Sequence, residues 1–167
     1  KDYLQLTRLH ADTNANGTGY ARGVEFFWRD KTTFKNFDYW VTYSYLNTKR
    51  DYLNFPYALT PNFAAAHTAN LVVKRFFTKL NTQFNLNYQF ATGRPYYDFS
   101  LNTANQKWDI RDQGRTIAYN NLSVSVNYLT KIGNAFGVVV FSVNNVLNSK
   151  QVFGYTYSYD GTNKVPT

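Results

Sequence analysis

Arginine and aromatic residues gather between positions 94 and 115, and their chemistry is that of a ligand-binding loop. Side chains of these two kinds dominate the binding energy at many interfaces. If the fold exposes this segment at an open mouth, we expect it to contact an anionic ligand. The candidate residues are Arg94, Tyr96, Tyr97, Trp108, Arg111 and Arg115.

Other residues with chemical potential lack the partners that catalysis or metal binding requires. His10 and His67, both expected in loops, show no paired-histidine or H-x-x-E spacing, whereas a metal site needs several convergent ligands. Asp109 and Asp112 flank Arg111, but no nucleophile, base and oxyanion arrangement accompanies them, so we interpret them as salt-linked loop residues. The sequence therefore predicts no enzyme, no metal site and no cofactor.

The composition favours a protein built almost wholly of β-strands. Of the 167 residues 19% are aromatic, with 15 Tyr and 14 Phe, and these residue types fit a pleated, half-buried surface. Cysteine is absent, which excludes disulfides and thiolate metal sites. Methionine is absent even at position 1, so we expect the chain to be an internal piece of a longer protein.

The charge is strongly positive but is distributed in a way that does not predict nucleic-acid binding. The net charge is +8, yet no cluster of Lys and Arg could track a phosphate backbone. Three long windows, residues 80–93, 116–130 and 132–149, carry no charge at all. A soluble sheet places charge on its wet face, whereas a transmembrane barrel has uncharged strands with charges at its rims. The pattern therefore favours a transmembrane barrel.

The clearest strand signal lies in residues 80–90, where apolar and polar residues alternate. One parity carries mainly apolar side chains and the other only Asn and Gln, which predicts a strand with one apolar and one uncharged polar side. Eleven residues at about 3.3 Å each and a tilt near 45° rise about 26 Å, which matches the ~25 Å apolar band of outer-membrane barrels.

Five further strands are predicted, and the connections between the six alternate in length. The strands cover residues 20–29, 37–46, 68–77, 121–128 and 137–147. Short connections are expected at 31–36, 77–79 and 130–136, and long ones at 48–67, 93–119 and after 148. Short periplasmic turns and long external loops are the barrel convention. Six antiparallel strands are too few to close a barrel, whose smallest form has eight, so further strands must complete it.

Several motifs, at barrel spacing, resemble those of a known family. Residues 19–25, Gly-Tyr-Ala-Arg-Gly-Val-Glu, resemble the "G-x-A-x-G-x-E" strand of TonB-dependent receptors. Residues 91–97 look like the family's "tG-x-P" exit into an external loop. Residues 142–148, followed by 152–155, resemble the penultimate strand's "v-x-N-v-l-n" signature, and residues 40–51 and 61–71 fit the same pattern. The resemblance covers nearly the whole chain and is greatest to members from Bacteroidota.

The resemblance implies an antiparallel transmembrane β-barrel segment of about six strands, within a 22-stranded barrel that surrounds a plug. Residues 1–167 would form a partial barrel, without the plug domain and final strand. The whole protein would import a siderophore, cobalamin, glycan or peptide across the outer membrane of a Gram-negative bacterium. Its partners would be membrane lipid, lipopolysaccharide, the rest of the barrel and the TonB complex. Glu25 would face the lumen, where it could pair with plug arginines or remain an ordinary wet residue.

Other interpretations stay open. The arginines between residues 94 and 115 could form a solvated rim that touches lipopolysaccharide phosphates. The protein could be a passive porin or a structural barrel, which the lack of a plug domain in the parent would show. It could also be a secreted soluble β-sandwich that acts as a binding module, which solubility without detergent would reveal, because a sandwich buries its inner faces.

Overall fold

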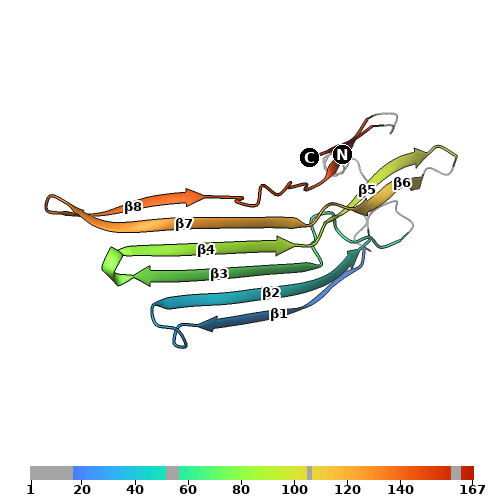
Figure 1. Ribbon diagram of the computed structural model, residues 1–167. Helices are drawn as coiled ribbons and strands as arrows, with labels where there is room; N and C mark the ends of the chain where they lie inside the picture. Colours follow the sequence, from blue (N-terminus) through green and yellow to red (C-terminus); the bar gives the residue numbers. More distant parts are fainter. Residues whose placement is uncertain (1–16, 52–56, 105–106, 159–162) are drawn as a thin grey trace.

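The computed structural model describes residues 17–51, 57–104, 107–158 and 163–167. In this part of the chain the regular structure is β, apart from one short 3-10 turn at Thr78–Leu80. The predicted all-β class is confirmed. The main element is one antiparallel sheet of six strands in the order β1-β2-β3-β4-β7-β8 (Figure 1). The strands are β1 Gly19–Asp30, β2 Phe37–Arg50, β3 His67–Phe77, β4 Thr82–Ala91, β7 Tyr119–Ile132 and β8 Ala135–Val143.

Two smaller hairpins accompany the sheet. β5 (Pro95–Asn102) pairs with β6 (Lys107–Arg115), and β9 (Tyr155–Tyr157) pairs with β10 (Lys164–Pro166). The predicted long connection over residues 93–119 links β4 to β7, but it contains the β5–β6 hairpin, which the sequence did not predict. Frequent charged residues obscure the period-two pattern of β6, although Trp108 and Ile110 alternate with Asp109 and Arg111 along it.

Short and long connections lie at opposite ends of the sheet (Figure 1). We call the end with the short links 31–36, 78–81 and 133–134 the turn end. The opposite loop end carries both small hairpins and residues 57–66 of the connection between β2 and β3. Asn36, Asn81 and Gly133 hold left-handed backbone angles in the three turns, with φ of 63°, 49° and 63°. Asn and Gly tolerate this region better than other residues, which explains why the chain reverses there.

The pairing register gives the sheet two chemically distinct faces. Phe84 of β4 lies between Arg75 of β3 and Val126 of β7, and the next row places Leu86 between Val73 and Val124. We call this side the apolar face. On the opposite side, the polar face, Gln89 of β4 lies between Asn70 and Asn121. The alternation predicted for each strand therefore continues across neighbouring strands.

Several predicted strand boundaries differ from the structure. β2 extends to Arg50 and β7 covers Tyr119–Ile132, and two further differences have a clear local cause. Leu80 belongs to the 3-10 turn, and β4 begins only at Thr82 because Asn81 is left-handed. The last predicted strand stops at Val143 rather than at residue 147. Just after this point Asn145 has a φ of 53°. Its side-chain amide accepts a hydrogen bond from the Ser149 amide at 3.0 Å and donates one to the Ser149 carbonyl at 3.2 Å. These local hydrogen bonds replace the ladder and end β8.

The six-stranded sheet forms a single open layer. Its edge strands are β1 and β8. Among the described residues only Leu59, Ala64 and Val72 form a buried hydrophobic core, and none of them lies on the apolar face. Apolar-face side chains remain accessible, with Phe26 56%, Phe84 45% and Phe141 69% exposed. No helix in the described chain is long and apolar enough to cross a membrane.

Candidate functional site

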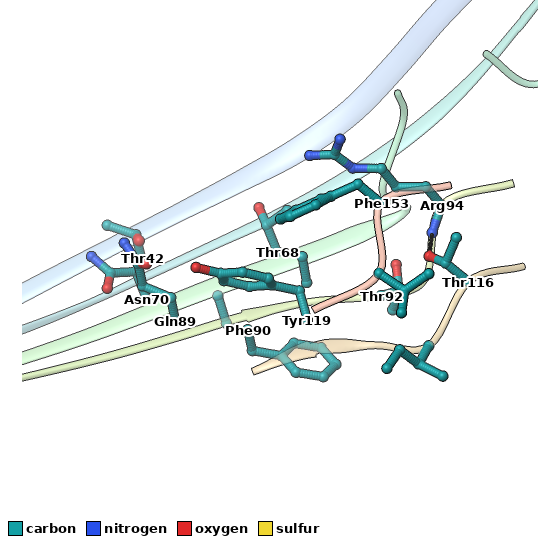
Figure 2. Close-up of a pocket in the computed structure, with 14 residues that line it drawn as sticks. Thr42, Thr68, Asn70, Gln89, Phe90, Thr92, Arg94, Thr116, Tyr119 and Phe153 are labelled. Atoms are coloured by element: carbon teal, nitrogen blue, oxygen red, sulfur yellow. Dashed lines mark hydrogen bonds between the residues drawn. The ribbon is translucent and has the colours of Figure 1, made fainter. Parts of the chain in front are cut away.

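A pocket of about 440 Å³ opens at the loop end of the sheet (Figure 2). Four neighbouring strands, β2, β3, β4 and β7, supply side chains from the polar face, and residues near 94, 116 and 153 complete the walls. Figure 2 shows Phe90 pointing to the other side of the sheet from Asn70 and Tyr119. The polar and aromatic lining residues are Thr42, Thr68, Asn70, Gln89, Thr92, Arg94, Thr116, Tyr119 and Phe153.

Phe153 and Arg94 overhang the strands and give the pocket its depth. The Phe153 ring lies 6.0 Å from the Tyr119 ring, and the Arg94 guanidinium lies 5.3 Å from the Phe153 ring centroid. The backbone holds both residues in place. The amide of Phe153 donates to the Thr167 carbonyl at 2.8 Å, and the amide of Arg94 donates to the Thr116 hydroxyl at 2.9 Å. The pocket thus combines an aromatic wall with one fixed cation.

Asn70 presents a hydrogen-bond acceptor that the described protein leaves unused. Its Oδ1 is buried and receives no hydrogen bond from the described residues, and the same holds for Asn87 Oδ1 on the adjacent strand. An unsatisfied buried polar atom costs about 1–3 kcal/mol, which a donor from a bound molecule or from water would recover. Asn70 lines the pocket beside Gln89. This wall can therefore accept a hydrogen bond from a ligand.

The chemistry of the pocket suits a polar molecule that is neutral or anionic. Amides, hydroxyls and one guanidinium line it, and no acidic side chain appears among its described lining residues. Tyr119 and Phe153 add ring surfaces against which an apolar part of a ligand could pack. Such a mixture of apolar walls and a few oriented polar groups is typical of ligand sites.

Only one of the six predicted ligand-binding residues lines this pocket, and that residue is Arg94. Arg111 donates from Nε to Asp98 Oδ2 at 2.5 Å, within the β5–β6 hairpin. Arg115 donates to the Gly93 carbonyl at 3.3 Å, and the Tyr97 hydroxyl donates to the Thr60 carbonyl at 3.0 Å. Trp108 is half-buried on β6 opposite Leu101. The structure therefore does not bring the six together in one site.

Tyr96 instead joins a cluster that ties the two hairpins together. The Lys164 ammonium lies 3.9 Å from the Tyr96 ring centroid and 4.5 Å from that of Tyr155, and it donates to the Tyr96 hydroxyl. Asp112 accepts hydrogen bonds from Lys164 at 3.0 Å and from the Tyr157 hydroxyl at 2.5 Å. We call these five residues the lysine cluster.

The lysine cluster shifts the acidity of its own members. Hydrogen bonds from Tyr157 and Lys164 lower the pKa of the Asp112 carboxyl below its usual range. Burial, together with the hydrogen bond to Asp112, raises the pKa of Tyr157 to about 12. The hydrogen bond to Tyr96 raises the pKa of Lys164. Each shift favours the ordinary charge state of its group at neutral pH, which is a carboxylate for Asp112, a neutral phenol for Tyr157 and an ammonium for Lys164.

Glu25 and His67 lie on opposite faces of the sheet. Glu25 is exposed on the polar face of β1, beside Ser44, and has no ion pair with the described residues. His67 was predicted in a loop, but it is the first residue of β3, and its Nδ1 lies 2.7 Å from the Tyr43 hydroxyl. The described chain contains no group of three or more His, Asp or Glu side chains that could hold a metal ion. Pairing of Glu25 with a plug remains a prediction.

Aromatic side chains form two belts across the apolar face. At the turn end, Trp28 packs edge-on against Tyr39 at 5.3 Å, and Phe77 packs against Phe84 at 5.4 Å. At the loop end, Tyr43 and Tyr45 pack around His67, with the Tyr45 ring 5.0 Å from the imidazole. Aliphatic residues lie beside these aromatic groups in the same rows, with Val41 and Leu71 in the row of Trp28, and Val73, Leu86 and Val124 in the row of Tyr39.

No family model, curated protein or solved structure matches the chain. The fold alone therefore defines its class, which is an all-β protein with an open, single-layer antiparallel sheet and two smaller hairpins.

Proposed function

We propose that this chain forms wall strands of an outer-membrane β-barrel, with the apolar face toward lipid and the polar face toward the lumen. The supporting observation is the uncovered apolar face, which carries aromatic groups toward both of its ends. Outer-membrane barrels carry an apolar band about 25 Å tall, flanked by aromatic girdles, and a polar interior. From Phe37 to Asn47 β2 advances ten residues. That is about 33 Å along the strand, or about 25 Å across a membrane at a tilt near 40°.

A soluble β-sandwich explains the exposed apolar face less well than a barrel wall does. A sandwich covers one face of each sheet with a second sheet about 10 Å away. Here the two small hairpins lie at the loop end and leave the central apolar strands uncovered (Figure 1). Each large apolar side chain left in water forgoes about 1.5–3 kcal/mol of burial free energy. Lipid would cover these side chains without a second sheet.

We further propose that the parent is a TonB-dependent receptor, in which this segment belongs to a barrel of the 22-stranded type and helps to import a scarce ligand. Unpaired edges such as those of β1 and β8 are costly in lipid, so additional strands would continue the sheet on both sides. The pocket beside Arg94 opens on the polar face at the loop end. In such a barrel this position belongs to the external vestibule, where an incoming ligand first binds.

Single-cysteine labelling of the full-length protein in intact cells tests this arrangement directly, because the chain has no cysteine of its own. Ala104→Cys lies at the loop end and Asn134→Cys in a turn-end link. A membrane-impermeant maleimide should label Ala104→Cys on intact cells and Asn134→Cys only after the outer membrane is permeabilised. Equal labelling of both sites on intact cells, or neither site in the membrane fraction, would refute the barrel.

Energy coupling needs a separate test, because a passive porin shares the same wall. Cells that depend on the protein for a scarce nutrient should stop growing when the TonB complex is removed, if the parent is an energised importer. Growth that continues unchanged without the complex, together with steady ion conductance in planar bilayers, would identify a passive channel. The Ala104→Cys and Asn134→Cys labelling pattern would be the same in both cases.

A further inference from the structure

The turn end of the sheet carries basic side chains with few carboxylates among them, whereas the loop end of the described chain holds more side chains of both signs. The three short links and the strand residues beside them contain seven basic side chains and two carboxylates in the described chain. At the loop end, Asp98 and Asp112 pair with Arg111 and Lys164. The turn-end cations are Arg29, Lys31, Lys35, Lys74, Arg75, Lys79 and Lys131.

The two turn-end carboxylates are already engaged by other groups. Asp38 accepts two hydrogen bonds from Arg29, at 2.6 and 2.8 Å. Asp30 accepts from the backbone amides of Thr32 and Thr33, at 2.7 and 3.0 Å, and from the Tyr39 hydroxyl at 3.0 Å. Neither carboxylate pairs with Arg75. Most of the positive charge at this end is therefore uncompensated within the described residues.

Arg75 is the cation of this group that stands on the apolar face of β3, where it pairs in register with Phe37 and Phe84. Its guanidinium lies 4.6 Å from the Phe37 ring centroid and 4.4 Å from that of Phe77. It is exposed, and it makes no hydrogen bond or ion pair with any described residue. A guanidinium carries five N–H donors, and stacking on rings leaves the donors at its edge directed outward.

We propose that Arg75 binds the phosphate of an anionic phospholipid, with Phe37 and Phe77 packing against the adjoining part of the lipid. The site rests on the proposed function, since it requires the apolar face to contact a membrane. Guanidinium and phosphate form paired, charge-assisted hydrogen bonds. Lys35 and Lys79 lie in the two turns next to the end of β3, and the Phe76 amide donates to the Asn36 carbonyl at 3.0 Å, which holds the first turn close. They add attraction for a negatively charged headgroup.

The position in the fold selects a phospholipid rather than lipopolysaccharide. Short turns of outer-membrane barrels face the periplasm, so the turn end would meet the inner, phospholipid leaflet. Arg75 lies in the turn-end aromatic belt, at the height where a belt meets headgroups. Lys74, its neighbour on β3, instead stacks on Trp40 of the polar face at 4.9 Å and would face the lumen.

The test compares Arg75→Gln with Arg22→Gln in the full-length protein, purified in detergent and titrated with phosphatidylglycerol by native mass spectrometry. Arg22 is the matched control, because it lies on the same face at the loop end with its guanidinium 4.6 Å from the Tyr20 ring. We expect about tenfold weaker phosphatidylglycerol binding for Arg75→Gln, as for the loss of one charge-assisted contact. Arg75→Lys should recover part of the affinity, and Arg22→Gln should bind as the unchanged protein does.

Three outcomes would overturn the site. Equal losses in Arg75→Gln and Arg22→Gln would indicate a general effect of charge. Unchanged binding in Arg75→Gln would show that the guanidinium has no part in it. If the protein bound diacylglycerol, which has no phosphate, as tightly as phosphatidylglycerol, the aromatic belt alone would account for lipid binding. If the cysteine labelling at residues 104 and 134 still follows the barrel pattern, the lipid site alone has failed, whereas failure of that labelling removes the proposed function as well.

Discussion

The ammonium group of Lys164 lies 3.9 Å from the ring centroid of Tyr96, a residue 68 positions earlier in the chain. This contact joins β10 to β5, and Asp112 of β6 completes it through its 3.0 Å ion pair with Lys164. Phe153 lines the pocket, and its backbone amide donates a hydrogen bond to the carbonyl of Thr167, just after β10. The contact between Lys164 and Tyr96 holds β10 in place and therefore helps to position this wall of the pocket.

We predict that Asp112→Asn loosens the two hairpins from each other. The amide keeps one acceptor for Tyr157 but loses the charge that attracts Lys164. Spin labels at Ser100→Cys on β5 and Thr156→Cys on β9, measured by double electron–electron resonance in the full-length protein, should give a broader distance distribution. Asp98→Asn is the control, because Asp98 pairs with Arg111 inside the β5–β6 hairpin. An equally broad distribution in both variants would contradict this role of Asp112.

The docking of the hairpins should also depend on pH at both extremes. The lowered pKa of Asp112 means that its contribution is present above about pH 4 and is lost as acid protonates the carboxylate. The raised pKa of Tyr157, about 12, means that its contribution is complete below about pH 10 and is lost as the phenol ionises near pH 12. The same pair of spin labels should therefore report one narrow distance from about pH 5 to 9. A distribution that broadens near pH 7 would contradict the assignment.

Gly23 should resist substitution because its strand approaches β2 closely. A Cβ at this position would lie 2.2 Å from the Tyr45 carbonyl oxygen, which is backbone and cannot rotate away. We expect Gly23→Ala to cost about 1–3 kcal/mol of unfolding free energy, as overpacking does elsewhere. Gly17→Ala is the matched control, since its Cβ would meet no atom within 4 Å. Urea titration of the full-length protein in lipid vesicles measures both, and equal stability of the two variants would refute the clash.

The strands of the main sheet could be predicted because their signal is local and simple. Alternation of Phe84, Leu86 and Tyr88 with Asn85 and Asn87 depends only on the two-residue period of a strand, and no charged residue interrupts it. The turn at Asn81 blurred the boundary, because its left-handed backbone shifts the start of β4 to Thr82 without changing the apolar pattern.

The pocket and the lysine cluster could not be predicted in the same way, because they depend on contacts between distant segments. Phe153 reaches Tyr119, and Lys164 reaches Tyr96 and Asp112, only once two hairpins of charged and aromatic residues have folded over the loop end. The sequence predicted one ligand-binding group of arginine and aromatic residues between residues 94 and 115. It could not show that Arg111 is bound to Asp98 while Arg94 lines a pocket.

The assignment of lipid and lumen to the two faces makes the sharpest prediction. Leu86 lies on the apolar face of β4 and Asn87 on its polar face, both near the middle of the strand, and Phe84 and Asn85 form the corresponding pair closer to the turn end. An arginine that faces lipid near the bilayer midplane costs about 2–4 kcal/mol, whereas an arginine that faces a wet lumen costs little. Leu86→Arg should therefore lower the free energy of unfolding in vesicles by about that amount, and Phe84→Arg by less because Phe84 lies nearer the headgroups, while Asn85→Arg and Asn87→Arg should change it by less than about 1 kcal/mol.

Because Leu86 and Asn87 are consecutive, they lie at nearly the same depth between the same neighbouring strands, so their comparison isolates the direction of the side chain. Phe84→Ala and Leu86→Ala separate the loss of the apolar group from the cost of the charge. If the arginine costs were equal on both parities, β4 would be covered alike on its two faces, as in a protein layer, and the barrel wall would be refuted. If Asn85→Arg and Asn87→Arg were the costly pair, the faces would be reversed, and Arg75 would point into the lumen rather than toward lipid phosphates.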